Sequence, residues 1–513
     1  MSPAASAPAM RVEHRGFITV SIMLATIMQA LDTTIANVAL PYMQGSLSAA
    51  QDQITWVLTS YIVAAAVMTP VTGWITGRFG LKRVFLVSVG GFTLASMLCG
   101  AAGSLGEIVV FRLLQGVFGA ALVPLSQAVL LDINPKERQG QAMAIWGAGI
   151  MVGPILGPTL GGWLTFNYDW RWVFYINLPV GILAFLGILF FVRDTKRDRG
   201  LRFDFLGFGL LSIAVGALQL MLDRGEQNDW FCSIEIVIEL AVALCGFWMF
   251  ALWTSIAGRP FLNPALLKDR NFVGSCVLIF ILGIILYATL ALLPPMLQSL
   301  MDYPVTTSGL VMMPRGVGTM IALLAVGRLI GRVDVRWLLL AGLGITAFSL
   351  YQMTGYSLTM DWWPIVTAGI VQGVGLGFLF VPLSTAAFAT LPATMRAEGA
   401  GIFSLVRNIG GSIGISMVVT LQDRMTQTAH ASLATQVTPF APSLHLPSVQ
   451  HFWNIHSAAG LAALNQEVTR QAAMIAYLDD FKLMMLIALV AAPLLLLLRR
   501  GQAPQGGAHA AMD

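Results

Sequence analysis

Long runs of apolar residues, separated by short polar segments, set the pattern of this chain from residue 16 to residue 498. There are about fourteen such runs, and each is close to the roughly 20 residues that a helix needs to cross a bilayer. The runs cover residues 16–38, 54–75, 84–103, 107–131, 141–164, 171–192, 204–222, 232–255, 272–293, 307–328, 336–356, 363–388, 399–421 and 481–498. The pattern predicts an all-α membrane protein with 14 transmembrane helices.

Lysine and arginine gather in alternate loops between these runs. The cations are Arg11, Arg15, Arg78, Lys82, Arg83, Lys136, Arg138, Arg193, Lys196, Arg197, Arg199, Arg202, Arg259, Lys268, Arg270, Arg328, Arg332, Arg336, Arg396, Arg499 and Arg500. The other short loops carry acids, with Arg171 and Arg224 near their edges: Asp52, Glu107, Asp169, Asp302 and Asp361. Because cytoplasmic loops carry the excess of cations, both termini are predicted to be cytoplasmic.

One outward segment, residues 422–480, is long for a loop in such a chain. It contains four histidines, and its last part, from Ala458 to Leu478, has the apolar periodicity of an amphipathic helix. The histidines are His430, His445, His451 and His456. Their spacing is irregular, which favours solvated loop histidines over a metal site, so we expect no bound metal.

The sequence repeats itself. LLQGVFGAALVPL from Leu113 returns as IVQGVGLGFLFVPL from Ile370, about 257 positions later. Two looser echoes, at Gly140 and Gly399 and at Gly73 and Gly327, keep the same order. Three ordered echoes predict two homologous halves around a central pathway, a common transporter architecture.

The repeat also predicts how the chain is divided. We expect a cytoplasmic tail at 1–15, an N-terminal six-helix half at 16–192, a cytoplasmic linker at 193–203, two inserted helices at 204–255, a second linker at 256–271, a C-terminal six-helix half at 272–498 that includes the periplasmic loop 422–480, and a cytoplasmic tail at 499–513.

Two glycine-rich strings are candidates for parts of the transport mechanism. The loop after the second run combines glycines, which allow a tight turn between packed helices, with cations: Gly73, Gly77, Arg78, Gly80, Lys82 and Arg83. The fifth run has small residues and prolines at near-regular spacing: Gly149, Gly153, Pro154, Gly157, Pro158, Gly161 and Gly162. Such spacing creates a flat face that lets a neighbouring helix approach closely. The alternative interpretation of the first string is an ordinary cation-rich cytoplasmic loop, and that of the second is helix packing alone.

Ionisable residues inside membrane spans are costly and usually functional. Asp32 in the first run and Arg112 in the fourth lie at similar depth near the outer ends of their spans. We therefore predict that Asp32 is the main proton acceptor and that Arg112 tunes its protonation. A static ion pair that holds two helices together is the alternative.

The expected substrate pathway contains further polar and aromatic residues, namely Gln29, Gln115, Trp146, Tyr175, Arg315, Phe403 and Arg407. Arg315 and Arg407 lie near mid-depth of the second half, with no acid there at comparable depth, which favours neutral compounds or lipophilic weak acids as substrates. Alternatively, both arginines bond backbone or water, and the aromatic residues are ordinary packing.

Composition excludes several classes of protein. Only 11% of the residues are charged, against roughly a quarter in a soluble domain. The four cysteines lie in apolar stretches without a pairing pattern, no histidine lies in a predicted span, and no GxxxxGK[ST] string is present. An enzyme and a direct ATP-driven pump are therefore disfavoured, and a sensor or scaffold would not need an intramembrane acid and base.

These motifs resemble those of the major facilitator superfamily. The strings from Leu31 to Pro41 and from Trp170 to Pro179 narrow the resemblance to the 14-span EmrB/QacA drug:proton antiporter family. The string from Gln219 to Gly225 and the long outward segment look more like the EmrB branch. The chain departs from the family's loop motif at Gly77, where an acid is usual.

The resemblance implies a major facilitator fold and proton-driven multidrug efflux by alternating access across the bacterial inner membrane. It also implies no cofactor beyond the proton gradient. The implied partners are the lipid bilayer, small lipophilic substrates, a periplasmic adaptor protein and an outer-membrane channel, with no nucleic acid. An importer of the same fold, a symporter or uniporter of a small organic solute, is the alternative, although it would normally lack the glycine–proline motif.

Overall fold

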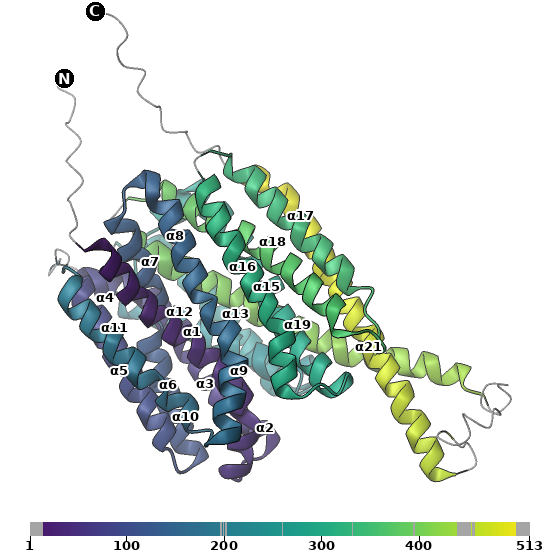
Figure 1. Ribbon diagram of the computed structural model, residues 1–513. Coiled ribbons are helices and arrows are strands. Elements are labelled where there is room, and N and C mark those ends of the chain that lie inside the picture. Colours follow the sequence, from purple (N-terminus) through teal and green to yellow (C-terminus); the bar gives the residue numbers. More distant parts are fainter. Residues whose placement is uncertain are drawn as a thin grey trace, which may run out of the picture.

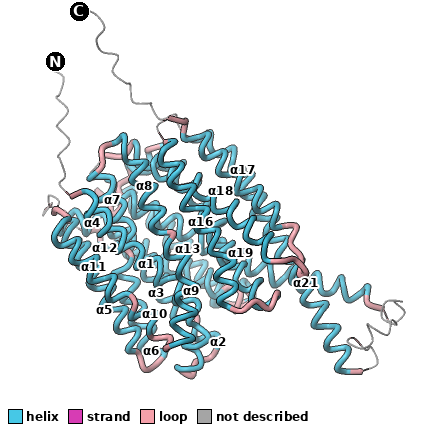
Figure 2. Tube along the Cα trace, in the orientation of Figure 1, coloured by secondary structure: helices cyan, strands magenta, loops and turns pink. Residues whose placement is uncertain are grey.

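The computed structural model of the chain describes residues 14–194, 197, 200, 203–258, 260–330, 332–392, 395–438, 453 and 457–498. Within these residues the chain is helical apart from short connections, and it contains no strand (Figure 2). The expected all-α architecture is therefore confirmed.

The N-terminal half contains the first six crossings. Its elements are α1 (Arg15–Ser46), α2 (Gln51–Ile54), α3 (Trp56–Met68), η1 (Thr69–Val71), α4 (Thr72–Phe79), α5 (Leu81–Ala101), α6 (Leu105–Gly119), α7 (Leu122–Ile133), α8 (Lys136–Ile150), α9 (Val152–Asn167), α10 (Trp172–Tyr175) and α11 (Asn177–Phe191). Three crossings are interrupted close to Pro70, Pro124 and Pro154, because proline lacks a backbone donor and its ring clashes with the carbonyl four residues earlier.

Two inserted helices and the C-terminal half follow. The elements are α12 (Phe205–Arg224), η2 (Trp230–Cys232), α13 (Ile234–Ile256), α14 (Ala265–Lys268), α15 (Arg270–Pro295), η3 (Met296–Leu300), α16 (Val305–Leu329), α17 (Val335–Met353), α18 (Trp362–Ala389), α19 (Arg396–Gln436), α21 (Ala458–Ala491) and η6 (Ala492–Leu497). In the described part of the chain, 13 helical segments are long and apolar enough to cross a membrane. The last run, in α21 and η6, supplies the fourteenth crossing.

The bundle has two distinct ends, which we name for their features. The basic end contains the start of α1 and the end of α21, together with Arg78, Lys82, Arg328 and Arg396 (Figure 1). At the opposite end, α19 and α21 run on past the other helices as a pair (Figure 1). We call this pair the hairpin and that end of the bundle the hairpin end.

The hairpin corrects the expectation of a loop over residues 422–480. Helix α19 continues to Gln436, since no glycine or proline interrupts it between Gly414 and Pro439. Helix α21 begins at Ala458, where the Ser457 side chain accepts a hydrogen bond from the Gly460 N–H. The amphipathic segment from Ala458 to Leu478 is thus the first part of one long helix.

Side-chain contacts join the two arms of the hairpin. The Gln422 amide donates to the carbonyl of Ala473 (3.3 Å), and the His430 ring nitrogen lies 3.0 Å from the side-chain oxygen of Asn465. The other three histidines named above lie outside the described residues.

Toward the basic end the two halves share a large hydrophobic core. There a single cluster includes Phe85, Leu130 and Trp146 from the N-terminal half and Phe272 and Phe388 from the C-terminal half. At the hairpin end each half has its own hydrophobic cluster. The two halves are therefore packed together at the basic end.

Each hydrophobic cluster at the hairpin end contains residues of one half alone. One surrounds Ile35, Val57 and Phe174 in the N-terminal half, and the other surrounds Leu293 and Leu350 in the C-terminal half. An arrangement closed at one end, with independent cores at the other, is typical of a transporter that rocks one half against the other.

Polar contacts also connect the halves. At the basic end, an Arg396 guanidinium N–H of α19 lies 3.2 Å from the Asp132 carboxylate of α7. Along the inserted helix α12, Gln219 accepts a hydrogen bond from Ser412 of α19 (2.9 Å), and Asp223 accepts one from Thr59 of α3. The insertion thus touches both halves.

Candidate functional site

Asp32 and Arg112 form a buried ion pair in the N-terminal half. A guanidinium nitrogen of Arg112 on α6 lies 2.7 Å from a carboxylate oxygen of Asp32 on α1. Both side chains are only 1% exposed. The similar depth expected for these two residues therefore corresponds to direct contact.

Further polar groups complete the bonding of this pair. The Asp32 carboxylate also accepts hydrogen bonds from the amides of Gln115 (2.9 Å) and Asn177 (2.8 Å). Arg112 donates to the carbonyl of Val57 (3.0 Å) and to the side-chain oxygen of Gln115 (2.8 Å). We call Asp32, Arg112, Gln115 and Asn177 the acid–base cluster.

Aromatic rings close over the arginine of this cluster. The guanidinium carbon of Arg112 lies 4.4 Å from the centroid of the Tyr61 ring and 5.8 Å from that of Phe174. Rings so placed attract a cation and exclude water. The pair is therefore isolated from solvent in this conformation, so a proton can reach Asp32 only after the cluster rearranges.

The glycines of the fifth crossing pack directly on the helix that carries Asp32. A Cβ atom added to Gly153 would lie 2.7 Å from the carbonyl carbon of Ala30, and one added to Gly161 would lie 3.2 Å from the Ile35 side chain. Thr34 also donates to the Gly153 carbonyl (3.2 Å). The flat face predicted from the sequence is thus turned toward α1.

Four of these glycines share that face. Gly149 lies against the Met23 side chain and Gly157 against Thr34, so the row Gly149, Gly153, Gly157 and Gly161 follows α1 over three turns. Pro154 and Pro158 belong to α9, and so does Gly162.

The opposite side of α9 reaches the C-terminal half. Positions for a Cβ on Gly309 and Gly316 of α16 lie within contact distance of Pro158 and Ile155. The motif helix therefore lies between α1, which carries the proposed proton acceptor, and the other half of the protein.

The loop motif lies at the basic end, where α4 meets α5. Gly80 has φ 92°, a conformation that favours glycine, and it ends α4 and begins α5. Gly73 packs against the backbone of Glu398 on α19, because a Cβ atom added to this glycine would lie only 2.8 Å from the Glu398 Cα. Gly77 and Arg78 lie in α4, and Lys82 and Arg83 lie in the first turn of α5.

Two of the expected pathway residues, Trp146 and Arg407, contact the same ring at the junction of the halves. The rings of Trp146 on α8 and Phe380 on α18 stack with centroids 6.2 Å apart. The guanidinium carbon of Arg407 on α19 lies 6.0 Å from the Phe380 centroid. On the N-terminal side, the Gln29 amide donates to the Tyr61 hydroxyl (3.3 Å).

Other expected pathway residues lie elsewhere. Gln115 belongs to the acid–base cluster, and Tyr175 packs against Gly100 of α5 and Trp172 within the N-terminal half. Phe403 is fully buried and contacts the Phe388 ring with centroids 5.6 Å apart. Tyr175 and Phe403 are thus packing residues in this conformation.

Arg315 is buried in the C-terminal half. Its side chain is on α16 and the residue is 6% exposed. Neither terminal guanidinium nitrogen has a hydrogen-bond partner among the residues that the structure describes. This arginine differs in that respect from Arg112.

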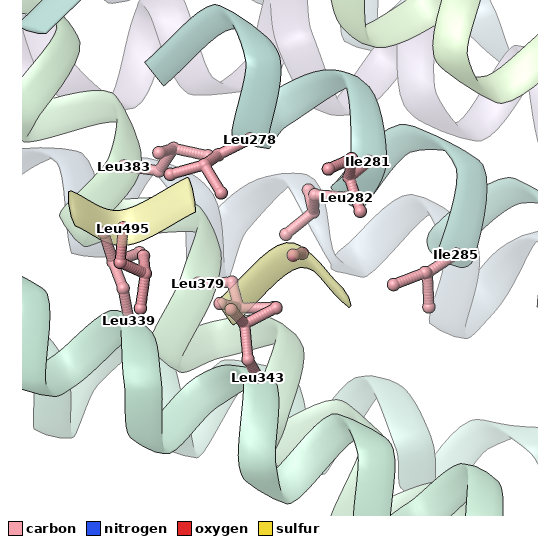
Figure 3. Close-up of a pocket in the computed structure, with 10 residues that line it drawn as sticks. Leu278, Ile281, Leu282, Ile285, Leu339, Leu343, Leu379, Leu383 and Leu495 are labelled. Atoms are coloured by element: carbon pink, nitrogen blue, oxygen red, sulfur yellow. The ribbon is translucent and has the colours of Figure 1, made fainter. Parts of the chain in front are cut away.

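A small apolar cavity of about 10 Å³ lies within the C-terminal half (Figure 3). Leucine and isoleucine side chains of α15, α17 and α18 line it, together with Leu495 of η6 (Figure 3). It has room for about one water-sized sphere, so it is no substrate site.

The sequence did not single out Asn177, Tyr61 or the Val57 carbonyl for this cluster. Asn177 is the first residue of α11 and is 1% exposed. Asn177 lies inside the apolar run 171–192, where a single asparagine is a weak signal, because such residues also cap and end helices. A backbone carbonyl gives no sequence signal at all.

Two packed helical halves, one of which holds an occluded acid and base, have the architecture of a secondary transporter. The chain matches the Major Facilitator Superfamily over residues 22–415. It is 34% identical to the fatty acid resistance protein FarB of Neisseria gonorrhoeae over 98% of this chain and 99% of that protein.

Two exporters are similarly related. The multidrug export protein EmrB of Escherichia coli is 36% identical over 83% of this chain and 84% of that protein. EmrB of Haemophilus influenzae is 35% identical over 88% and 90%. The chain therefore belongs to the Major Facilitator Superfamily, in the group that contains the EmrB exporters.

Solved structures support the fold independently. The human organic anion transporter MFSD10 (TETRAN) superposes with a TM-score of 0.58 at 14% identity, over 94% of this chain and 100% of that one. The proton:xylose symporter XylE does so with a TM-score of 0.58 at 13% identity, over 91% and 95%. At these identities the likeness concerns the fold alone.

Proposed function

We propose that this protein is a proton-driven exporter of lipophilic compounds in the bacterial inner membrane, working by alternating access. The basic end faces the cytoplasm, since cytoplasmic loops carry the excess of Lys and Arg. Both termini then lie in the cytoplasm, and the hairpin enters the periplasm. The named relatives support the direction of transport, because two are export proteins and one is a fatty acid resistance protein.

The observation that carries the proposal is the occluded pair of Asp32 and Arg112. A charged carboxylate in a membrane interior is costly unless it is fully paired, and here it accepts three side-chain hydrogen bonds. When a proton binds the carboxylate, its charge is lost and the attraction to Arg112 weakens. Proton binding therefore changes the force that holds α1 to α6.

The contacts of α1 connect this change to the movement of the halves. Helix α1 packs on the glycine row of α8 and α9, and α9 packs on α16 of the other half. A shift of α1 on protonation would therefore be transmitted to the junction of the halves. A proton taken up from the periplasm and released to the cytoplasm would then drive export in the opposite direction.

Trp146, Phe380 and Arg407 are the proposed substrate contacts. Two stacked rings offer an apolar surface, and a guanidinium beside them attracts a negative group. This combination fits lipophilic compounds that carry an acidic group better than it fits quaternary cations. Gln29, whose amide donates to the Tyr61 hydroxyl, is a further proposed hydrogen-bonding group for the substrate.

The hairpin is the proposed docking place of a periplasmic adaptor, which would connect the exporter to an outer-membrane channel. Its two long arms project beyond the bundle, where they are accessible to a partner (Figure 1). Replacing residues 425–470 by a short Gly-Ser linker should abolish adaptor co-purification but leave transport in liposomes intact. Unchanged adaptor binding would refute this part of the proposal.

Reconstituted transport tests the function. The purified protein in liposomes should move anilinonaphthalene sulfonate, a lipophilic permanent anion, against its gradient when a pH gradient is imposed. Asp32→Asn should abolish this uphill transport. The matched control is Asp302→Asn, because Asp302 is exposed and has φ 57°, where asparagine is well tolerated.

The outcomes of the liposome assay distinguish three alternatives to the proposal. Gradient-driven transport that survives in Asp32→Asn would place the proton site elsewhere. Transport without any dependence on the gradient would refute proton coupling. Movement of the anion in the same direction as the proton would favour the importer. Ethidium, a quaternary aromatic cation, should be transported more slowly than the anion.

A further inference from the structure

Asp480 on α21 is a buried acid that the mechanism above does not use. The residue is fully buried, and neither carboxyl oxygen has a hydrogen-bond partner among the described residues. It lies seven residues beyond Ala473, where the hairpin arms are still joined, which is roughly 10 Å further into the bundle. The sequence places it at the edge of the last apolar run.

Apolar side chains surround this acid. The neighbouring residues Tyr477, Phe481 and Met484 of α21 all belong to the hydrophobic cluster of the C-terminal half. The Phe481 ring meets the Tyr356 ring edge to face, with centroids 5.9 Å apart. An ionised carboxylate without a partner is very costly in such surroundings.

The charged groups of its own helix do not compensate it. Lys482 is exposed and pairs with Asp479 (2.9 Å), which is itself an acid. Tyr477 adds a phenol rather than a positive charge.

The helices packed on α21 carry cations, namely Arg270 on α15, Arg336 on α17 and Arg396, Arg407 and Arg424 on α19, but none of them bonds the Asp480 carboxyl. From α19, Asp423 and Arg424 are exposed on the hairpin, and from α17 the ionisable residue Tyr351 is exposed. From α15, Tyr287 lies against Gly411 of α19. Asp302, Tyr303 and Tyr356, in the connections at the hairpin end, are acids or phenols.

Arg315 on α16 is the one buried cation of this half in the described part of the chain. It is not paired with Asp480, since its terminal nitrogens have no described partner. The C-terminal half therefore holds a buried arginine and a buried acid that are apart, whereas the N-terminal half holds a buried arginine and acid in contact.

The repeat gives this difference a structural basis. Gln372 occupies the place of Gln115 in the repeated QGV string, and its amide donates to Thr289 (3.2 Å) on the first helix of its half, as Gln115 donates to Asp32. The Thr289 hydroxyl in turn lies 3.7 Å from the Met484 sulfur, one turn from Asp480. The C-terminal half thus has a hydroxyl on its first helix and its acid on its last.

We propose that Asp480 is a second proton-binding carboxyl of this transporter and that it carries its proton in this conformation. As a neutral acid it can be buried without a cation. Separation of α21 from α17 and α19 at the hairpin end would admit water, and the carboxyl would then release its proton to that water. The proposal deepens the proposed proton coupling and rests on it only for the use of this proton in transport.

Infrared difference spectroscopy tests the proposal without any substrate. The full chain in lipid nanodiscs, with isotope-labelled aspartate, is titrated from about pH 5 to pH 9, a window in which an exposed aspartate is already ionised. The wild type should show a protonated-carboxyl band that persists near neutral pH. Asp480→Asn should lack this band, and Asp480→Glu should lose the isotope shift but keep an unlabelled carboxyl band.

The control variant is Asp479→Asn, which removes the exposed neighbouring acid and should leave the band unchanged. Asparagine closely matches a protonated aspartate in shape, so Asp480→Asn should elute as a monodisperse protein like the wild type. If Asp480→Asn keeps the band of the wild type, or if the wild type has no such band, the proposal is wrong.

The transport assay separates this result from the proposed function. Loss of the band in Asp480→Asn, together with wild-type transport that ignores the pH gradient, would support the proton site and refute proton-driven export. Proton-driven transport by a wild type that lacks the band would support proton-driven export and refute the proton site at Asp480.

Discussion

The two halves of this protein hold similar chemical groups in different arrangements. In the N-terminal half, Asp32 and Arg112 are 2.7 Å apart and their bonding is completed by Gln115 and Asn177. In the C-terminal half, the terminal nitrogens of Arg315 and the carboxyl oxygens of Asp480 have no hydrogen-bond partner among the described residues. The two halves therefore hold one assembled ion pair and one separated pair of groups.

The difference shows that a repeated fold need not repeat its chemistry. The repeat preserves the glutamine and its bond to the first helix of each half, but not the acid beside it. A paired carboxylate is stable with its charge, whereas an unpaired buried one is stable only with a proton. The halves can thus hold different protonation states in one conformation.

Removing the buried arginine of each half should give the largest difference between the halves. Arg112→Met leaves Asp32 as a buried charge without its counter-ion, and should cost about 3–5 kcal/mol of unfolding free energy. Arg315→Met removes a cation that has no described partner, and should change stability by less than about 1 kcal/mol or increase it. Equilibrium unfolding in mixed micelles measures both. Equal losses in the two variants would contradict the account.

The contact between α1 and α9 should show the next largest effect. Gly153→Ala places a methyl group 2.7 Å from the Ala30 backbone, and such overpacking should cost roughly 1–3 kcal/mol. If this cost falls on a conformation through which transport passes, uphill transport of the anion should fall by about fivefold or more, because 1 kcal/mol corresponds to a factor of about 5.

Gly209→Ala on α12 is the matched control for that substitution. A Cβ there has nothing within 4 Å, and alanine in a helix is more favourable than glycine by about 0.5–1 kcal/mol. Its thermal midpoint should therefore stay the same or rise. Full transport in Gly153→Ala would show that the glycine row is not needed for close packing.

The smallest effect is expected at the basic end. Arg396 and Asp132 join the halves, but their side chains are 12% and 41% exposed, so the pair should contribute only about 0.2–1 kcal/mol. Arg396→Met should raise the population open at this end up to about fivefold. Distances between spin labels on the two halves measure that population. No shift toward the open form would mean that apolar packing alone closes this end.

The sequence predicted the crossings and the acid–base pair well. Apolar runs of membrane length leave little choice other than a helix, and the buried charges Asp32 and Arg112 were visible because charge is rare in such runs. The glycines of the fifth crossing indicated close helix packing because of their regular spacing. In each case a local pattern carried the information.

Other parts of the site depend on contacts between distant segments. The sequence could not show that Asn177 bonds Asp32, or that Tyr175 and Phe403 pack within their own halves, because aromatic residues suit a pathway and a core equally well. The helix from Ala458 was predicted, but the extension of α19 to Gln436 was not, because its polar composition resembles a loop. Asp480 was assigned to that loop, although α21 carries it into the bundle.

Proton movement driven by the substrate tests the central claim most directly. Liposomes that contain the protein and a pH-sensitive dye are given a gradient of anilinonaphthalene sulfonate with no initial pH difference. The account predicts proton movement opposite to the anion in the wild type and in Asp302→Asn, and none in Asp32→Asn. Proton movement in Asp32→Asn equal to that of the wild type, or anion transport by the wild type without proton movement, would contradict it.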